Sequence, residues 1–309
     1  MATVAVVDIG SNSTRLLVAQ VSDGRVDAEL ERRSTVTRLG AGVDRDGMLR
    51  EDAMQRVYAT LADYETAIGR HGADARIAVL TSAVRDSANG ERFAASVGER
   101  FGFSPHVLSG DEEARLTFLG ATSERDLTDA TPTLVFDIGG GSTEMVIGAG
   151  REVSFHVSTQ AGAVRQTERH LHSDPPPEAD QRELTADVEA IIADAVPDDE
   201  AARVSRAIGV AGTATSLAAI AQGLDPYDPA RVHGYQLSRA EGEQILARLA
   251  TMPLSQRREV AGLHPDRAPT IVAGGLIFLA VAQRFGLEKI EISEHDILRG
   301  AALALGDRP

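Results

Sequence analysis

The chain has 309 residues, 43% of them hydrophobic and 25% charged, which is typical of an ordinary globular protein. This length predicts two domains, each able to bury its own core. The formal net charge of −15 excludes general binding to DNA or RNA, because that function needs a basic face. The absence of cysteine excludes disulfides, thiolate catalysis and thiolate metal sites.

Phosphate binding by a Walker-type loop is also excluded. Lys289 is the only lysine among the 31 basic residues, so no G-K-[ST] sequence exists. The N-terminal segment reaches the carboxylate of Asp8 before an apolar secretory region forms, and the apolar run 271–282 is too short to cross a bilayer. We therefore expect a cytoplasmic protein with no membrane partner.

Strand-like and helix-like segments alternate along the chain, which predicts an α/β fold. In the first part, the pattern predicts strands over residues 3–7 and 14–21, a helix over 51–70, a strand over 76–81, a helix near 91–100, a strand over 106–108 and a helix that begins at S-G-D-E-E-A-R-L. In the second part, it predicts strands over 133–136, 143–148 and 152–157, a helix over 163–171, a loop at 174–178, a long polar helix, a strand over 204–210, helices over 214–221, 238–251 and 269–284, a strand over 289–293 and a short helix from residue 297.

One sequence motif occurs twice in the chain. V-V-D-I-G-S-N-S-T at residues 6–14 returns as V-F-D-I-G-G-G-S-T at residues 135–143, so that Asp8 corresponds to Asp137 at an offset of 129. Each copy predicts a β-hairpin around a turn that offers unpaired N–H groups, glycines and hydroxyls, a pattern that suits phosphate oxygens. A single copy is equally well explained as a plain tight turn. Two copies in domain-sized halves favour two phosphate-binding turns that face each other across a cleft, formed by Gly10, Ser11, Asn12 and Ser13 and by Gly139, Gly140, Gly141 and Ser142.

The polar stretch 123–132 is the predicted link between the halves. We therefore predict a first domain at residues 1–122, with the terminal helix 297–309 packed back on it, and a second domain at residues 123–296. A third glycine turn, at residues 209–217, opens a helix whose N-terminal dipole favours anions, which adds Gly212 and Thr213 as substrate-binding candidates.

The motifs together resemble the exopolyphosphatase and guanosine pentaphosphate phosphohydrolase (Ppx/GppA) family, within the actin, sugar kinase and Hsp70 superfamily. The resemblance covers nearly the whole chain. It rests on six motifs in the order and approximate spacing of the family: V-V-D-I-G-S-N-S-T-R-L-L-V, T-S-A-V-R-D-S-A-N-G, L-S-G-D-E-E-A-R-L-T-F-L-G, V-F-D-I-G-G-G-S-T-E, V-A-G-T-A-T-S-L-A and S-E-H-D-I-L-R-G. It implies two actin-like, ribonuclease H-like (ASKHA) domains that flank a cleft.

The catalytic base implied by the resemblance is Glu113. Ser109 and Glu112 fit a capping box, so the structural task of holding the helix start falls to Glu112 and leaves Glu113 free. Without the family, Glu113 is interpreted as a solvated glutamate favoured by the helix dipole. The resemblance reverses that interpretation, because Glu113 stands at the position of the family's general base.

Magnesium, or another divalent cation, is the cofactor that the resemblance implies. Asp8 and Asp137 would repel each other if their turns faced across a cleft, and a cation would offset that repulsion. Asp137 and Glu144 match the metal-associated positions of the family. Arg85 matches a phosphate-binding arginine, and Arg267 and Arg299 match other arginine positions, although either of the last two could make an interdomain salt bridge instead.

The function implied is release of terminal orthophosphate from inorganic polyphosphate, with guanosine pentaphosphate 5′-phosphohydrolase as the alternative. A sugar-kinase-like phosphotransferase and a nonenzymatic sensor are less consistent with the E-E-A-R motif and with the retained Glu113, Asp137 and Glu144. Longer family members carry further C-terminal domains, so we expect short polyphosphates to be preferred. The resemblance also implies a homodimer.

Overall fold

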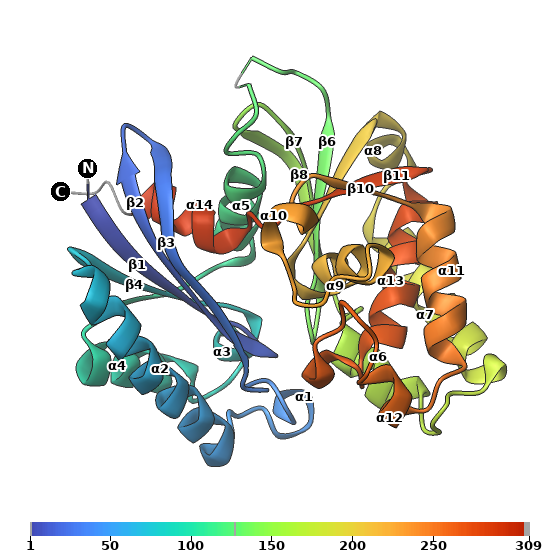
Figure 1. The fold of residues 1–309 in the computed structure, drawn as a ribbon, viewed down its shortest axis with the longest axis horizontal. Helices are drawn as coiled ribbons and strands as arrows, with labels where there is room; N and C mark the ends of the chain where they lie inside the picture. Colours follow the sequence, from blue (N-terminus) through green and yellow to red (C-terminus); the bar gives the residue numbers. More distant parts are fainter. Residues whose placement is uncertain (1, 127, 306–309) are drawn as a thin grey trace. The chain divides into compact units, whose positions relative to one another are not determined.

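The structure is a computed structural model that describes residues 2–126 and 128–305. The chain folds as two compact units, Met1–Ser123 with His295–Pro309 and Glu124–Glu294, shown in Figure 1. The predicted domain bounds, as limits of independently folding parts, stay a prediction. Residues 306–309 of the predicted terminal helix lie outside the described residues.

The first unit contains a mixed five-stranded sheet in the order β3-β2-β1-β4-β5. Strand β1 is antiparallel to β2 and parallel to β4, and its β-branched residues suit this central position. The strands are β1 (Ala2–Ile9), β2 (Ser13–Ser22), β3 (Arg25–Val36), β4 (Ala75–Leu80) and β5 (Ser104–Val107).

Helices cover both faces of this sheet, because alternate residues of β1 point to opposite sides. Ala5 and Val7 pack in a core with α2 and α4, whereas Val4 and Val6 pack in a second core with α5 and α14. The helices of this unit are α1 (Val43–Asp46), α2 (Glu51–His71), α3 (Ser82–Arg85), α4 (Gly90–Phe101), α5 (Gly110–Ala121) and α14 (Ile297–Leu305).

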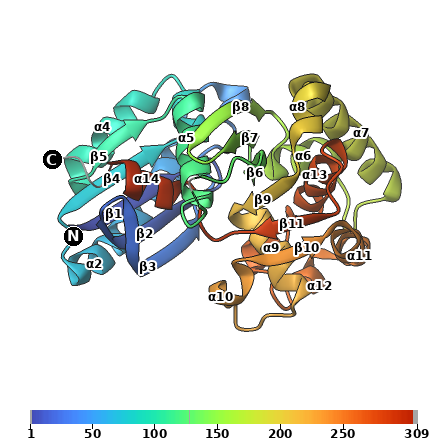
Figure 2. The ribbon, with the colours of Figure 1, turned by 90° about the horizontal axis from the view of Figure 1, so that it is seen from above.

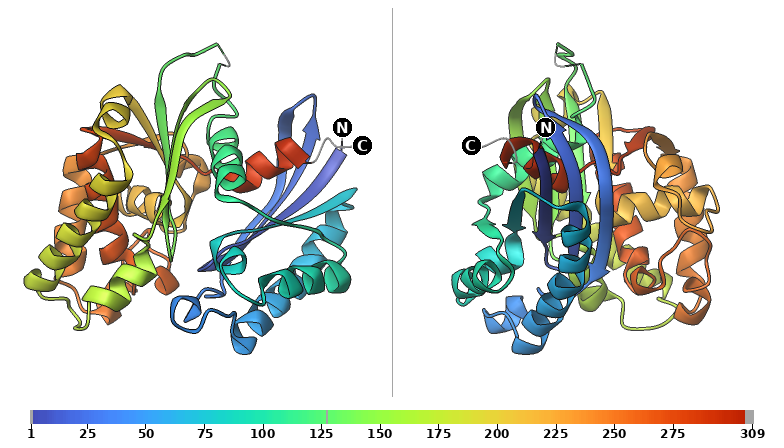
Figure 3. Two further views of the ribbon diagram at one scale, coloured as in Figure 1. Left: turned by 180° about the vertical axis from the view of Figure 1, so that it is seen from behind. Right: turned by 60° about the vertical axis from the view of Figure 1, so that its left-hand side comes forward.

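Two glycines bring α5 and α14 together, and the two helices lie side by side in Figure 3. A Cβ at Gly300 would overlap the carbonyl oxygen of Leu116, and one at Gly120 would overlap the carbonyl oxygen of Asp296. The segment that carries Asp296 is therefore fixed against the end of α5.

The second unit contains a mixed six-stranded sheet in the order β10-β11-β9-β6-β7-β8. Figure 2 shows β9, β11 and β10 following one another at one edge. The strands are β6 (Thr133–Ile138), β7 (Thr143–Ala149), β8 (Glu152–Thr159), β9 (Arg206–Val210), β10 (Tyr235–Ser238) and β11 (Lys289–Ile292).

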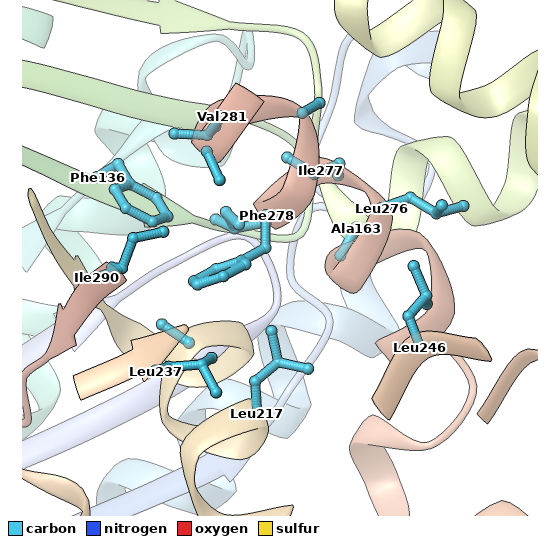
Figure 4. Close-up of a cluster of buried hydrophobic side chains, with 14 of the residues drawn as sticks. Phe136, Ala163, Leu217, Leu237, Leu246, Leu276, Ile277, Phe278, Val281 and Ile290 are labelled. Carbon is cyan, nitrogen blue, oxygen red and sulfur yellow. The ribbon is translucent and has the colours of Figure 1, made fainter. Parts of the chain in front are cut away.

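The core of the second unit forms around α13, an apolar helix that is buried along most of its length. Phe278 of this helix tilts against Phe136 of β6, and Leu217, Leu237 and Ile290 surround the pair (Figure 4). The helices of this unit are α6 (Ala163–His170), α7 (Glu178–Ala195), α8 (Asp198–Arg203), α9 (Ala211–Ala221), α10 (Pro229–Val232), α11 (Arg239–Ala250), α12 (Leu254–Arg257), α13 (Ile271–Arg284) and the 3₁₀ helix η1 (Pro265–Arg267).

The two sheets share one topology. Strands β6, β7, β8, β9 and β11 of the second unit repeat the order of β1, β2, β3, β4 and β5 of the first, and β10 adds an antiparallel edge. The predicted α/β class and the internal duplication are both present. No helix among residues 2–126 and 128–305 is both long and apolar enough to span a membrane.

Candidate active site

The first duplicated turn joins β1 to β2 and is closed by a hydrogen bond from Gly10 N–H to the Ser13 carbonyl (3.0 Å). The carbonyls of Ser11 and Asn12 point back to the segment 37–40, and Ser11 Oγ lies 3.0 Å from Ser82 Oγ. Within the described residues, the N–H groups of Ser11 and Asn12 have no hydrogen-bond acceptor. The bonds from the segment run from Gly40 N to Ser11 O (2.8 Å), and from Thr37 N and Arg38 N to Asn12 O (3.0 and 2.8 Å).

The second turn joins β6 to β7 and is closed in the same way, from Gly139 N–H to the Ser142 carbonyl (2.9 Å). Here the first turn of α6 satisfies the carbonyls of residues 139–141. No acceptor among the described residues receives the N–H groups of Gly140, Gly141 or Ser142. The bonds run from Ala163 N to Gly139 O (2.9 Å), from Val164 N and Arg165 N to Gly140 O (2.9 and 3.1 Å), and from Arg165 Nε to Gly141 O (2.8 Å).

In both turns, carbonyl groups accept hydrogen bonds from a neighbouring segment, and consecutive N–H groups have no acceptor among the described residues. Such a run of backbone donors forms a concavity that binds anions. Gly162 makes the second arrangement possible, because a Cβ there would overlap the backbone of Gly141. The predicted turn residues of each unit lie together as expected; how the two turns face each other stays a prediction.

The charge pattern beside the turns differs between the two units. Asp8 stands opposite Arg15 across β1 and β2, whereas the equivalent Asp137 stands opposite Glu144 across β6 and β7. Opposed residues of an antiparallel pair lie close on one face of the sheet, and like charges there are destabilising. The first unit neutralises its aspartate internally, and the second places two carboxylates together.

Asp8 is only 4% exposed, and burial raises the pKa of its carboxyl group above the ordinary value, although the Arg15 guanidinium opposes this shift. Arg15 donates to Asp8 Oδ2 from both Nε (2.9 Å) and Nη2 (2.6 Å), and it also pairs with Asp296 through Nη1. Asp8 Oδ1 is buried without a hydrogen-bond partner among the described residues. Sequence reasoning missed Arg15, although the offset of 129 that relates it to Glu144 was available.

Glu144 is 9% exposed and accepts a hydrogen bond from Ser158 Oγ (2.9 Å). Glu144 is therefore a buried carboxylate of β7. The pair Asp137 and Glu144 offers only carboxylate oxygens, the ligand type that Mg²⁺ prefers. These residues fit a divalent cation, because it would offset the repulsion between them.

Glu113 lies in the first turn of α5, and the predicted capping box is confirmed: Ser109 Oγ accepts from Glu112 N–H, and the Glu112 carboxylate accepts from Ser109 N–H. Glu113 is 9% exposed, so the interpretation of Glu113 as a solvated glutamate is wrong. Burial raises the pKa of its carboxyl group, Arg85 lowers it in part, and the charge of Asp8 raises it further. Glu113 and Asp8 thus share one electrostatic environment.

Arg85 follows β4 in the short helix α3 and holds Glu113 in place. Its Nη1 donates to Glu113 Oε2 (2.9 Å) and to the Leu108 carbonyl (3.0 Å). Its Nε also lies 3.4 Å from Asp86 Oδ1. Arg85 therefore connects α3 to the carboxylate at the start of α5, and its predicted contact with phosphate stays a prediction.

In the second unit, Gly212, Thr213 and Arg267 meet at the start of α9. A Cβ at Gly212 would overlap the Arg267 guanidinium, so only glycine allows this approach. Thr213 Oγ1 lies 3.4 Å from the carbonyl of Ile138, at the end of the strand that carries Asp137. The third glycine turn and the second duplicated turn therefore lie at one edge of the sheet.

Arg299 lies in an ion-pair network of the first unit. Its Nε donates to Ser123 Oγ (2.8 Å), and its Nη1 donates to Glu29 Oε1 (3.1 Å) and lies 3.2 Å from His295 Nε2. These contacts give Arg299 a structural task next to the point where the chain leaves the first unit.

Comparison with known proteins identifies the family. The model of the Ppx/GppA phosphatase family matches residues 17–303. The chain belongs to this family. It is 37% identical to Exopolyphosphatase 2 of Mycobacterium tuberculosis, over 98% of both chains. The predicted class of enzyme, a phosphatase of the Ppx/GppA family, is confirmed.

Solved structures of Ppx/GppA proteins share the fold. The chain matches an exopolyphosphatase-like protein at 35% identity with a TM-score of 0.88, over 98% of this chain and 97% of that one. It matches the Aquifex aeolicus Ppx/GppA family member at 30% identity with a TM-score of 0.82, again over 98% and 97%. Together with the two related mixed sheets, these matches confirm the predicted actin-like fold class.

Proposed function

We propose that this Ppx/GppA protein is an exopolyphosphatase that releases terminal orthophosphate from inorganic polyphosphate. The observation that carries the proposal is the duplicated turn. Its carbonyl groups accept hydrogen bonds from neighbouring segments, whereas its consecutive N–H groups have no acceptor among the described residues. Two such turns suit one polyanion better than a single phosphate group. The name of the Mycobacterium tuberculosis relative supports the same substrate class.

In the proposed reaction, a water oxygen attacks the terminal phosphorus atom and the bond to the bridging oxygen breaks. Glu113 accepts the proton of the attacking water. The terminal group is released as orthophosphate, and the shortened polyphosphate leaves with the bridging oxygen as an anion. Burial suits Glu113 to this task, because a raised pKa makes its carboxylate a stronger base. The turns and Arg85 would lower the activation barrier further by stabilising the negative charge of the phosphoryl group, since phosphoryl transfer depends mainly on positioning and electrostatics.

Asp137 and Glu144 would hold Mg²⁺ or another divalent cation, directly or through water. When bound, the cation neutralises phosphate charge and orients the terminal group. Asp8, with its unpaired buried Oδ1, is the group of the first unit best suited to accept from a water or a metal-bound water. Arg267, Gly212 and Thr213 would bind phosphate groups farther along the chain.

We expect short polyphosphates to be preferred. Guanosine pentaphosphate 5′-phosphohydrolase is the alternative, because its terminal anhydride presents the same chemistry. The expected homodimer and cytoplasmic location stay predictions.

A phosphate-release assay tests the proposal with short polyphosphate, long polyphosphate, guanosine pentaphosphate and ATP as substrates. We expect short polyphosphate to give the highest kcat/KM, and Glu113→Gln to lower kcat by about 10²- to 10⁴-fold through loss of the general base. Glu112→Gln is the matched control, because glutamine preserves a capping box and activity should be retained. Release from ATP alone, or full activity in Glu113→Gln, would contradict the proposal.

A further inference from the structure

We propose that Arg38 is an additional substrate-binding residue, which holds a phosphate group of the polyphosphate chain next to the one cradled by the turn Gly10–Ser13. The inference rests on the proposed function. Three independent features of Arg38 support it: its attachment to the turn, its backbone conformation and its unpaired charge.

Arg38 is fixed to the first turn through the main chain. Its N–H donates to the Asn12 carbonyl (2.8 Å), and its neighbour Thr37 donates to the same oxygen (3.0 Å). The buried hydroxyls of Thr37 and Thr14 also lie 3.0 Å apart. These contacts hold the backbone of Arg38 against the turn, and its long side chain extends from that point.

The backbone of Arg38 is strained. Its φ of 50° lies in the left-handed region, which is costly for a residue with a Cβ. Among the described residues, only Asp23 and Ala211 share this feature without being glycine. Asp23 is explained by the tight turn between β2 and β3, whereas Ala211 directly precedes Gly212 in the third glycine turn. Strain of this kind gathers at ligand sites, where function maintains it.

The charge of Arg38 is not used within the fold. The side chain is exposed and makes no ion pair with the residues that the structure describes. The nearby arginines are engaged: Arg50 and Arg56 both pair with Asp52. In a chain with a net charge of −15, a cation without a partner beside an anion-binding turn is available for a phosphate group.

A binding role and a structural role predict opposite results for Arg38→Gly. Glycine removes both the strain and the charge, so we expect a thermal midpoint equal to or above that of the wild type, together with a rise of about tenfold in KM for polyphosphate, the size expected for loss of a charge-assisted contact. Arg38→Lys should restore most of the affinity while it keeps the strain. A structural role alone would leave KM unchanged or lower the midpoint.

Arg25 provides the matched control. It is also exposed, makes no ion pair within the described part of the chain, and lies at the start of β3, roughly 35–40 Å from Arg38 at the strand's other end. Arg25→Gly should leave KM unchanged. An unchanged KM in Arg38→Gly, with Glu113→Gln inactive, would overturn the role of Arg38 and leave the proposed function standing. A wild-type protein that does not hydrolyse polyphosphate would overturn the proposed function instead.

Discussion

At the scale of single residues, adjacent glutamates have opposite tasks. Glu112 is engaged by Ser109 in the capping box, which lowers the pKa of its carboxyl group. Glu113, one position later and about 100° around the helix, turns into the protein and is buried beside Arg85. The capping contact fixes the rotation of the helix start and so decides which of the two carboxylates turns into the protein.

Arg85 should set the acidic limit of activity. Its guanidinium lowers the pKa of Glu113, so Arg85→Gln should raise that pKa and move the acidic limb of the kcat/KM profile to higher pH, because Glu113 must be ionised to accept a proton. The profile is measured from pH 4 to pH 8 with short polyphosphate. Residual activity of Glu113→Gln should lack this limb. An unmoved limb in Arg85→Gln would show that another group sets it.

At the scale of elements, α5, the helix that carries Glu113, packs closely against α14. Gly120 and Gly300 remove the only Cβ atoms that would collide with the facing backbone. Asp296, which pairs with Arg15, enters α14 at this crossing and accepts from Leu298 N–H (3.1 Å). Packing and hydrogen bonds thus connect the elements of the first unit that carry Glu113, Asp296 and, through Arg15, Asp8.

Gly300→Ala should be destabilising by about 1–3 kcal/mol, because the added methyl group overlaps main-chain atoms that cannot rotate away. Gly69→Ala is the control in α2. Its Cβ would meet no atom within 4 Å, so it should be neutral or stabilising by up to about 1 kcal/mol. Urea unfolding of both variants measures the difference. Equal stabilities would mean that α5 and α14 shift apart without cost.

At the scale of the whole molecule, the protein and its proposed substrate carry charge of the same sign. The net charge of −15 repels a polyanion, and binding therefore depends on local donors and on counter-charge. The two halves differ in the charge beside their turns: Asp8 stands opposite Arg15 in one, and Asp137 stands opposite Glu144 in the other. The second pair places two carboxylates opposite each other, and in the proposed mechanism these would hold a divalent cation.

Chelation should therefore abolish phosphate release, and Mg²⁺ should restore it. Sodium chloride at matched ionic strength should not restore activity, because screening cannot replace a cation between two carboxylates. Glu144→Gln should raise the Mg²⁺ concentration needed for half-maximal activity. Activity that persists in excess chelator would contradict a metal site at Asp137 and Glu144.

Sequence patterns located the strands and helices that bury an apolar face. They missed β3 (Arg25–Val36), because its early alternation of exposed charged and half-buried apolar residues is interrupted by the charged run 31–33. They also missed β10 and the four-residue helices, which are too short to show a period. Among the site residues, the turns were found through their repetition, whereas Arg15 and Arg38 were not found, because nothing local distinguishes one arginine from thirty.

The sequence by itself determined the duplicated motif, the capping box at Ser109 and the order of the elements, because each depends on neighbours within a few positions along the chain. Only the tertiary structure decided which groups lie together: Glu113 with Arg85, Asp8 with Arg15 and Asp296, and Arg267 over Gly212. These pairs join residues from different elements, up to 281 positions apart. The burial of Asp8 and Glu113, and hence the raised pKa of each carboxyl group, follows from how the sheets and helices pack and cannot be obtained from local pattern.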